Sequence, residues 1–363
     1  MALEVADHAL MDPQATGPEA VRGAFLNQVA YCRNNQAPVT ALVCFALAEL
    51  LEGDRGGAVM ARIRAWRGPA LADALPLRIA GGLHALHLSG AEPGLAAIYS
   101  GESPPDATER IAHALEAHEG ALISWLDGPP QTNEAGRSWG FAAAMLWLAE
   151  QGCPDKFVLY ELGSSAGINL MMDRYRFDLG GVTAGPEGAA MRIAPEWRGQ
   201  PPPARRFEVV SAQGCDIAPV DLTDPQQALR LRAYIWPELT ERFARMDAAV
   251  AAANEAKPRI VQQAAKDFVA DMLARPAKPG VTRVIMHSVV WQYIPMAERD
   301  AITAAIEAAG ARATAEGPLA WVMLEANRNS HRHELRVRWW PGGPEPVHLA
   351  TAHPHGAWVE WGG

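Results

Sequence analysis

The residues best suited to chemistry lie between Glu161 and Gly167, in the run ELGSSAG. An apolar stretch over residues 157–162 leads into this run, and helix-forming residues follow over 166–175. This order predicts a strand, a glycine turn and a helix. Glycines let a ligand approach the backbone closely, and the N–H groups at a helix start attract anions. The stretch therefore predicts a site for a nucleotide-like ligand whose phosphate, ribose or carboxylate lies against the backbone.

The same run also matches the nucleophile-elbow pattern GxSxG, with Ser165 as the nucleophile. Asp267 and His287, or the later His353 and His355, would complete the order Ser…Asp…His. Against this interpretation, predicted helices rather than several strands precede the elbow, and no HGGG-type oxyanion motif accompanies it. A third interpretation is a turn whose glycines only permit close packing. The residues of the loop leave all three interpretations open.

A second polar stretch, HSVVWQYIP at residues 287–295, follows a predicted buried strand. His287 suits a general base, because an imidazole titrates near neutral pH, and Tyr293 is the second predicted catalytic residue. Trp291 is predicted to stack on a flat or cationic substrate. Packing in the core explains His287 and Trp291 equally well.

A third polar stretch, QTNEAGR at residues 131–137, gathers hydrogen-bonding groups at one predicted helix start. Asn133, Glu134 and Arg137 are predicted to bind the substrate beside the glycine loop. Glu134 and Arg137 are three residues apart and share a helix face. A helix cap with a surface ion pair is the alternative, and the spacing alone favours it.

Composition limits the class of protein. The chain has 363 residues, which is more than one core usually holds, so two domains are expected. The net charge of −9 argues against a nucleic-acid partner. No two of the four cysteines have CxxC spacing, and neither a signal sequence nor a membrane span is recognisable. We expect a cytoplasmic protein with a small-molecule substrate, no membrane partner and no metal; the oligomeric state is not predicted.

Hydrophobic periodicity divides the chain into two regions. Residues 1–130 read as an all-helical N-terminal domain, and residues 131–363 as an α/β domain. Strands are predicted at 157–162, 207–211, 259–263, 282–290 and 319–326, with helices between them. An antiparallel hairpin around PGGPEP should follow, and a smaller hairpin is expected around MRIAPEW. The predicted fold is a doubly wound, mostly parallel sheet with right-handed crossovers.

This pattern of strands resembles the S-adenosylmethionine-dependent methyltransferases, a Rossmann-like fold. The resemblance implies S-adenosylmethionine as cofactor, with Glu161 engaging its ammonium group and the glycines lying against its amino-acid portion. Asp216 stands where the acid for the ribose hydroxyls is expected, with Asp178 as its rival, and Asp267 where the adenine contact is expected. The residues predicted to bind the cofactor are Glu161, Gly163, Ser164, Ser165, Gly167, Asn169, Asp216 and Asp267.

Longer runs identify the chain as a member of an uncharacterised bacterial family, domain of unknown function 2332. They lie at residues 77–90, 131–138, 161–178, 214–225, 231–238 and 287–295. This family implies no activity. The predicted function is therefore that of an S-adenosylmethionine-binding, methyltransferase-like protein acting on a small-molecule acceptor. A GxSxG serine hydrolase using Ser165 and a non-enzymatic ligand-binding protein are the alternatives.

Overall fold

The chain folds into two compact units, in a computed structural model that describes residues 12–327, 330 and 332–363. The first unit combines the chain up to Thr132 with Pro225–Phe243, and the second combines Asn133–Asp224 with Ala244–Gly363. The predicted boundary near residue 130 assigned residues 225–243 to the α/β domain, whereas their contacts group them with the first unit. The two units are therefore discontinuous in sequence.

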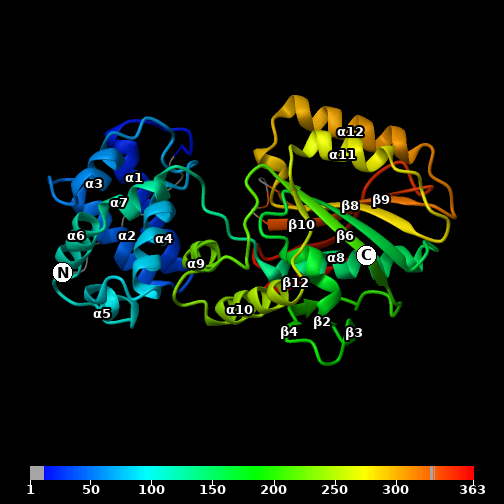
Figure 1. Cartoon of the computed structure of the whole chain (residues 1–363), viewed down its shortest axis with the longest axis horizontal. Coiled ribbons are helices and arrows are strands. Elements are labelled where there is room, and N and C mark those ends of the chain that lie inside the picture. The colour runs from blue at the N-terminus through cyan, green and yellow to red at the C-terminus, as the bar shows by residue number, and fades with distance from the viewer. Residues whose placement is uncertain (1–11, 328–329, 331) are drawn as a thin grey trace. The chain divides into compact units, whose positions relative to one another are not determined.

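Helices form the described part of the first unit (Figure 1). They are α1 (Pro18–Asn34), α2 (Pro38–Leu50), α3 (Gly57–Arg64), α4 (Leu75–Leu88), η1 (Pro93–Leu95), α5 (Ala96–Tyr99), α6 (Ala107–Ala117), α7 (Glu119–Leu122), η2 (Ile123–Leu126), α9 (Pro225–Ala233) and the first turn of α10 (Thr240–Glu255). Phe25, Leu47 and Ile79 lie fully buried in their common core. His118 separates α6 from α7.

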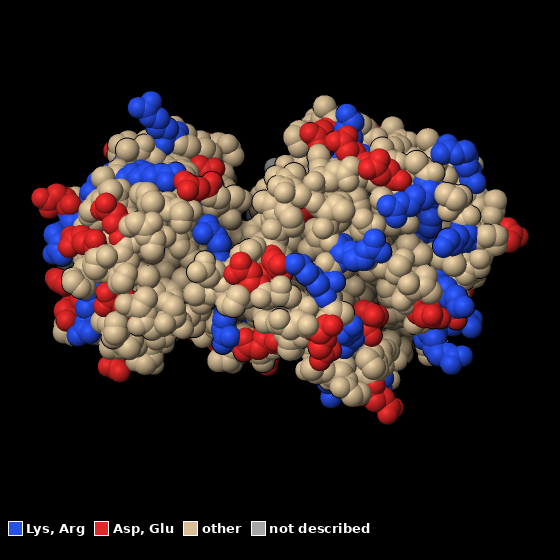
Figure 2. Space-filling view, in the orientation of Figure 1, with Lys and Arg blue, Asp and Glu red and all other residues tan. Residues whose placement is uncertain are grey.

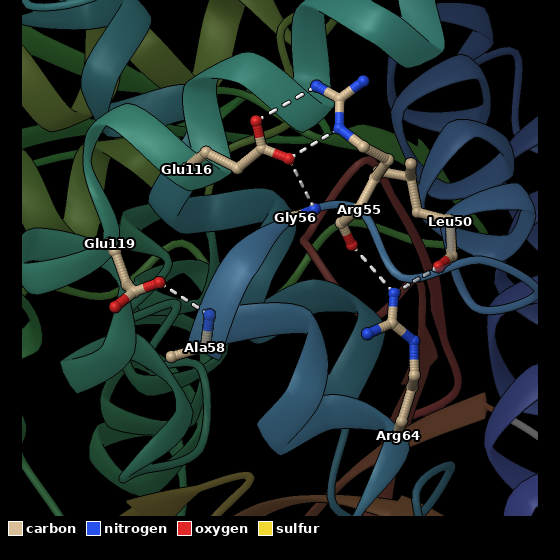
Figure 3. A network of polar contacts seen from close by, with 7 residues as sticks. All are labelled: Leu50, Arg55, Gly56, Ala58, Arg64, Glu116 and Glu119. Carbon is tan, nitrogen blue, oxygen red and sulfur yellow. Dashed lines mark hydrogen bonds and ion pairs between the residues drawn. The ribbon is translucent and has the colours of Figure 1, made fainter.

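Two helices of this unit are capped by glutamates from elsewhere in the chain. The residues that precede α2 and α3, Ala37 and Gly56, make no side-chain cap. Glu116 accepts a hydrogen bond from the Gly56 amide at 2.9 Å, and Glu119 accepts one from the Ala58 amide at 2.6 Å (Figure 3). These carboxylates satisfy amides that a helix start leaves without intrahelical partners, and a negative charge there is favourable.

Glu238 caps α2 in the same way. Its Oε1 accepts the amides of Val39 and Thr40 at 2.6 and 3.2 Å, and its Oε2 accepts the Thr40 hydroxyl at 3.1 Å. Glu238 lies 198 residues along the chain from Thr40. The cap therefore attaches residues 225–243 to the first unit.

Replacing Glu238 by alanine is expected to lower the free energy of unfolding of the first unit by about 1–2 kcal/mol, because three hydrogen bonds at a helix start are lost. Hydrogen exchange of the amides in Pro38–Leu50, with and without urea, would measure the change. Glu109→Ala, an exposed glutamate of α6, is the matched control and should change stability by less than about 0.5 kcal/mol. Equal protection of α2 in both variants would show that the cap contributes nothing.

A nine-stranded mixed sheet forms the centre of the second unit, in the order β5-β12-β11-β10-β9-β8-β1-β6-β7. The parallel strands predicted from the sequence are β1 (Lys156–Leu162), β6 (Glu208–Asp216), β7 (Ile260–Gln262), β8 (Thr282–Ser288) and β9 (Leu319–Asn327). The antiparallel strands that follow are β10 (Arg332–Trp340), β11 (Val347–Ala352) and β12 (Trp358–Trp361). The prediction of an α/β fold with a large, mostly parallel sheet is therefore confirmed.

Helices lie on both faces of this sheet. α11 (Ala265–Ala274) and α12 (Met296–Gly310) pack together over one face (Figure 1), where Phe268, Ile302 and Ile306 meet Tyr160 of β1 in a common core. α8 (Ser138–Glu150), preceded by η3 (Ala135–Arg137), contacts β9. Because neighbouring residues of a strand point to opposite faces, Glu161 points away from the face that buries Tyr160.

Three local predictions differ from the structure. The helix expected over 166–175 is a short 3-10 segment, η4 (Ile168–Arg174), whose dihedral angles break at Met171. The hairpin at MRIAPEW does not form: β4 (Met191–Ile193) joins β2 (Tyr175–Leu179) and β3 (Val182–Ala184) in a separate sheet, whereas β5 (Glu196–Arg198) pairs with β12. α8 begins at Ser138, after the residues 131–137 that were predicted to start it. No helix among the described residues is long and apolar enough to cross a bilayer.

Candidate functional site

The order of the strands indicates a site at the carboxyl ends of the central strands of the sheet. β1 pairs with β6 on one side and β8 on the other. The chain continues from β1 through β6 to β7 and then returns to β8 across β1, so the direction of strand addition reverses between β1 and β8. In open α/β sheets, ligands bind outside the carboxyl ends of the strands at such a reversal. The loop over residues 163–167 begins at that point.

The loop has a tight, left-handed backbone. Gly163, Ser165 and Gly167 have φ angles of 65°, 52° and 71°. A Cβ atom at Gly163 would overlap the side chain of Val290, and one at Gly167 would lie 2.8 Å from the Cβ of Pro258. Both glycines therefore lie against protein side chains, as the close-packing interpretation expects. The short 3-10 segment after the loop is also no regular helix start, which removes the predicted dipole contribution to anion binding.

Asp216 holds the loop from the neighbouring strand. It ends β6, and its Oδ2 accepts the Ser165 amide at 2.8 Å while its Oδ1 accepts the Ala218 amide at 2.9 Å. Its rival Asp178 lies in β2, in the small separate sheet, and pairs with Arg192. Of the two acids, Asp216 is the one that contacts the glycine loop.

Glu161 is a buried carboxyl group with one engaged and one free oxygen. Its side chain is 2% exposed, and its Oε1 accepts a hydrogen bond from Asn169 Nδ2 at 2.7 Å. Asn169 in turn accepts one from the Ser138 hydroxyl of α8 at 2.8 Å. The Oε2 atom of Glu161 has no hydrogen-bond partner among the described residues. Burial raises the pKa of Glu161 to about 8.

The hydroxyl of Ser165 is buried and makes no hydrogen bond to any residue that the structure describes. A serine nucleophile needs a base within hydrogen-bond distance to take its proton. The left-handed φ of Ser165 fits a nucleophile elbow. The described contacts supply it with no histidine.

His287 has partners at both ring nitrogens. Trp321 Nε1 donates to its Nε2 at 3.0 Å, so Nε2 is the acceptor and the ring proton lies on Nδ1. Nδ1 lies 2.6 Å from Glu325 Oε1 and donates to it. In this arrangement neither nitrogen is available to take a proton from a substrate. The predicted general base instead joins β8 to β9.

Glu325 also anchors the loop after β8. Its Oε1 accepts the amides of Val290 and Trp291 at 3.1 and 3.2 Å. The Trp291 ring stacks on His287, with the centroids 4.9 Å apart. The sequence contained a signal for this role, because Glu325 stands near the end of a predicted strand, as Glu161 and Asp216 do.

Two further residues that were predicted to belong to the site, Tyr293 and Asp267, are exposed to solvent. Tyr293, in η5 (Trp291–Tyr293), is 68% exposed. Asp267 is also exposed, but it lies in the first turn of α11 rather than at the end of β7. The position of Asp267 thus differs from the strand-end position expected for an adenine contact.

The QTNEAGR stretch contacts the loop through its asparagine. Asn133 Nδ2 donates to the Ser164 carbonyl at 3.1 Å, and its Oδ1 accepts the Ile168 amide at 3.4 Å. Glu134 is buried and pairs with Arg245 at 2.9 Å, and Arg137 donates from Nε to the Pro354 carbonyl at 3.0 Å. Asn133 therefore positions the loop, whereas Glu134 and Arg137 bind other parts of the second unit.

Ionisable side chains of the described residues form no candidate metal centre. Within the described ranges, no group of three or more His, Cys, Asp or Glu side chains is arranged to hold a metal ion. On the face drawn in Figure 2, basic and acidic side chains are interspersed.

Comparison with known proteins gives a family and no activity. A family model described as an uncharacterised protein conserved in bacteria, DUF2332, matches residues 22–361. No curated protein and no solved structure matches the chain.

Proposed function

Because the chain belongs to this uncharacterised bacterial family, we propose its function from the site itself: an S-adenosylmethionine-binding, methyltransferase-like protein acting on a small-molecule acceptor. One observation carries the proposal. The parallel strands have the order β7-β6-β1-β8-β9, which numbered along the chain is 3-2-1-4-5, and the glycine loop follows the central strand. Rossmann folds share this order, and the antiparallel strands β10, β11 and β12 that follow β9 support the resemblance to the methyltransferases.

Two acids flank the loop at neighbouring strand ends, which supports the proposal. Glu161, near the end of β1, would engage the ammonium of the cofactor through its free Oε2. Asp216, at the end of β6, would engage the ribose hydroxyls, since one carboxylate can accept from two vicinal hydroxyls. Because the sulfonium is a good leaving group, transfer of its methyl group depends mainly on in-line placement and needs little acid–base catalysis, so an occupied His287 is compatible with it.

Titration calorimetry of the full chain with S-adenosylmethionine, and separately with S-adenosylhomocysteine, tests the proposal. We expect saturable binding of both ligands at one site. Asp216→Ala should weaken binding by about tenfold to a hundredfold, because it removes a charged acceptor from the cofactor and from the Ser165 amide.

Asp178→Ala is the matched control, since Asp178 is an aspartate of the same unit that does not touch the loop. It should bind as the wild type does, and circular dichroism would establish that both variants are folded. Absence of binding to the wild type, or equal binding by Asp216→Ala and the wild type, would contradict the proposal.

The left-handed Ser165 is the one observation that favours a serine hydrolase instead. A fluorophosphonate probe separates the two functions, because it labels an activated serine covalently. We expect no labelling, since the Ser165 hydroxyl has no hydrogen-bond partner among the described residues. Labelling that disappears in Ser165→Ala would establish the hydrolase.

A further inference from the structure

The buried carboxyl group of Glu161 has neutral or acidic surroundings. Its neighbours in register on β6 and β8 are Gly214 and Met286, neither of which carries a charge. Asn169 and Ser164 are its polar neighbours, and the charged group that acts on it, Asp216, is another acid. Tyr175 and Cys215 also sense its charge, and both are neutral when protonated.

These surroundings favour the protonated acid when no ligand is bound. A carboxylate buried without a cation is costly, and a second negative charge nearby adds to the cost. The acceptor for Asn169 is Oε1, so the acidic hydrogen belongs on Oε2, which has no partner among the described residues. The Ser165 hydroxyl, four residues further along, is buried and unpartnered as well. Buried oxygens without a partner are rare in folded proteins, and each is an atom with which a polar ligand group would complete the hydrogen bonding.

We propose that ligand binding at the Oε2 atom of Glu161 releases the Glu161 proton to solvent. This inference rests on the proposed function, in which the ammonium belongs to the amino-acid portion of the cofactor. The O–H bond of the acid breaks, the proton passes to buffer, and a charge-assisted N–H···O bond forms in its place. No covalent bond to the ligand is made.

The linkage has a definite sign. Only the deprotonated acid makes the charge-assisted bond, so affinity rises with pH until the ligand-free acid is itself ionised. The pKa of Glu161 in the ligand-free protein is about 8. Between pH 6 and 7, affinity should therefore increase about fivefold to tenfold, and binding at pH 7 should release about 0.5 to 1 proton. An α-ammonium group stays largely protonated at these pH values, so the ligand contributes little to the change.

Calorimetric titration of the full chain with S-adenosylhomocysteine at pH 6 and 7 measures both quantities. Each titration is repeated in buffers of different ionisation enthalpy, and the slope of the observed enthalpy gives the number of protons released. Glu161→Gln keeps an oxygen for Asn169 and resembles the neutral acid in shape, so it should fold. Its proton number should be near zero, and its affinity should be independent of pH over this range.

The outcomes separate this inference from the function on which it rests. Binding by the wild type with a proton number near zero, or equal proton release by Glu161→Gln, overturns the proton linkage alone. Asp178→Ala should release the same number of protons as the wild type. Absence of binding by the wild type overturns the proposed function and the linkage with it. The wild-type proton number decides the question even if Glu161→Gln does not fold.

Discussion

Replacing Glu325 by alanine is expected to lower the free energy of unfolding of the second unit by about 3–5 kcal/mol. Its Oε1 accepts three hydrogen bonds, from the ring of His287 and the amides of Val290 and Trp291. Alanine leaves all three donors without that acceptor, and the His287 ring is almost fully buried. Urea denaturation followed by tryptophan fluorescence suits the measurement, because Trp291 and Trp321 both contact His287.

Two variants serve as references for this experiment. Glu325→Gln retains a side-chain oxygen and should lose only about 1–2 kcal/mol, the difference between a charged and a neutral acceptor. Glu360→Ala removes an exposed carboxylate from β12 and should change stability by less than about 0.5 kcal/mol. A loss below about 1 kcal/mol in Glu325→Ala would mean that solvent replaces the missing acceptor.

The second large effect is a dependence of stability on pH that originates in Glu161. Burial raises its pKa from 4.5 to about 8. The folded protein therefore binds more protons than the unfolded chain between these values, and stability falls as pH rises through this window. The slope reaches about 1.4 kcal/mol per pH unit and declines near the folded pKa, so between pH 5 and 8 the wild type should lose about 2–4 kcal/mol through this group.

Glu161→Gln isolates that contribution, because glutamine cannot ionise. Denaturation curves of both proteins at pH 5 and pH 8, without ligand, should diverge with rising pH, and the variant should become the more stable protein. The other titrating groups are common to both and cancel in the difference. Parallel profiles would show that Glu161 is ionised in the folded state throughout this range.

The strands were predictable because burial leaves a local pattern. β8 is buried over residues 282–287, and its apolar run identified it, as did those of β1 and β9. The nature of the segment after the glycine loop was not predictable. Its composition suits a helix, but only seven residues separate Gly167 from β2, and the Tyr175 hydroxyl bonds back to the Ile168 carbonyl. Tertiary contacts there override helix propensity.

The sequence predicted those residues of the candidate site that stand at the ends of strands, and it did not predict their partners. Asp216 was identified because it ends a strand beside β1, and the structure brings it to the loop. The environment of His287 was hidden, since its partners Trp321 and Glu325 lie 34 and 38 residues away on another strand. Spacing within one run cannot reveal which nitrogen of a histidine is already occupied.

The discontinuity of the first unit has a consequence for biosynthesis. Most of its helices precede residue 133, yet the carboxylate that caps α2 is residue 238. While the chain emerges from the ribosome, β1 and β6 are made before Glu238 arrives. Until residues 225–243 are made, the start of α2 is therefore uncapped, and the core surface against which Ala233 and Tyr234 pack is uncovered. Order of synthesis and order of completion differ in this protein, and a nascent chain arrested before residue 225 should expose that surface to chaperones.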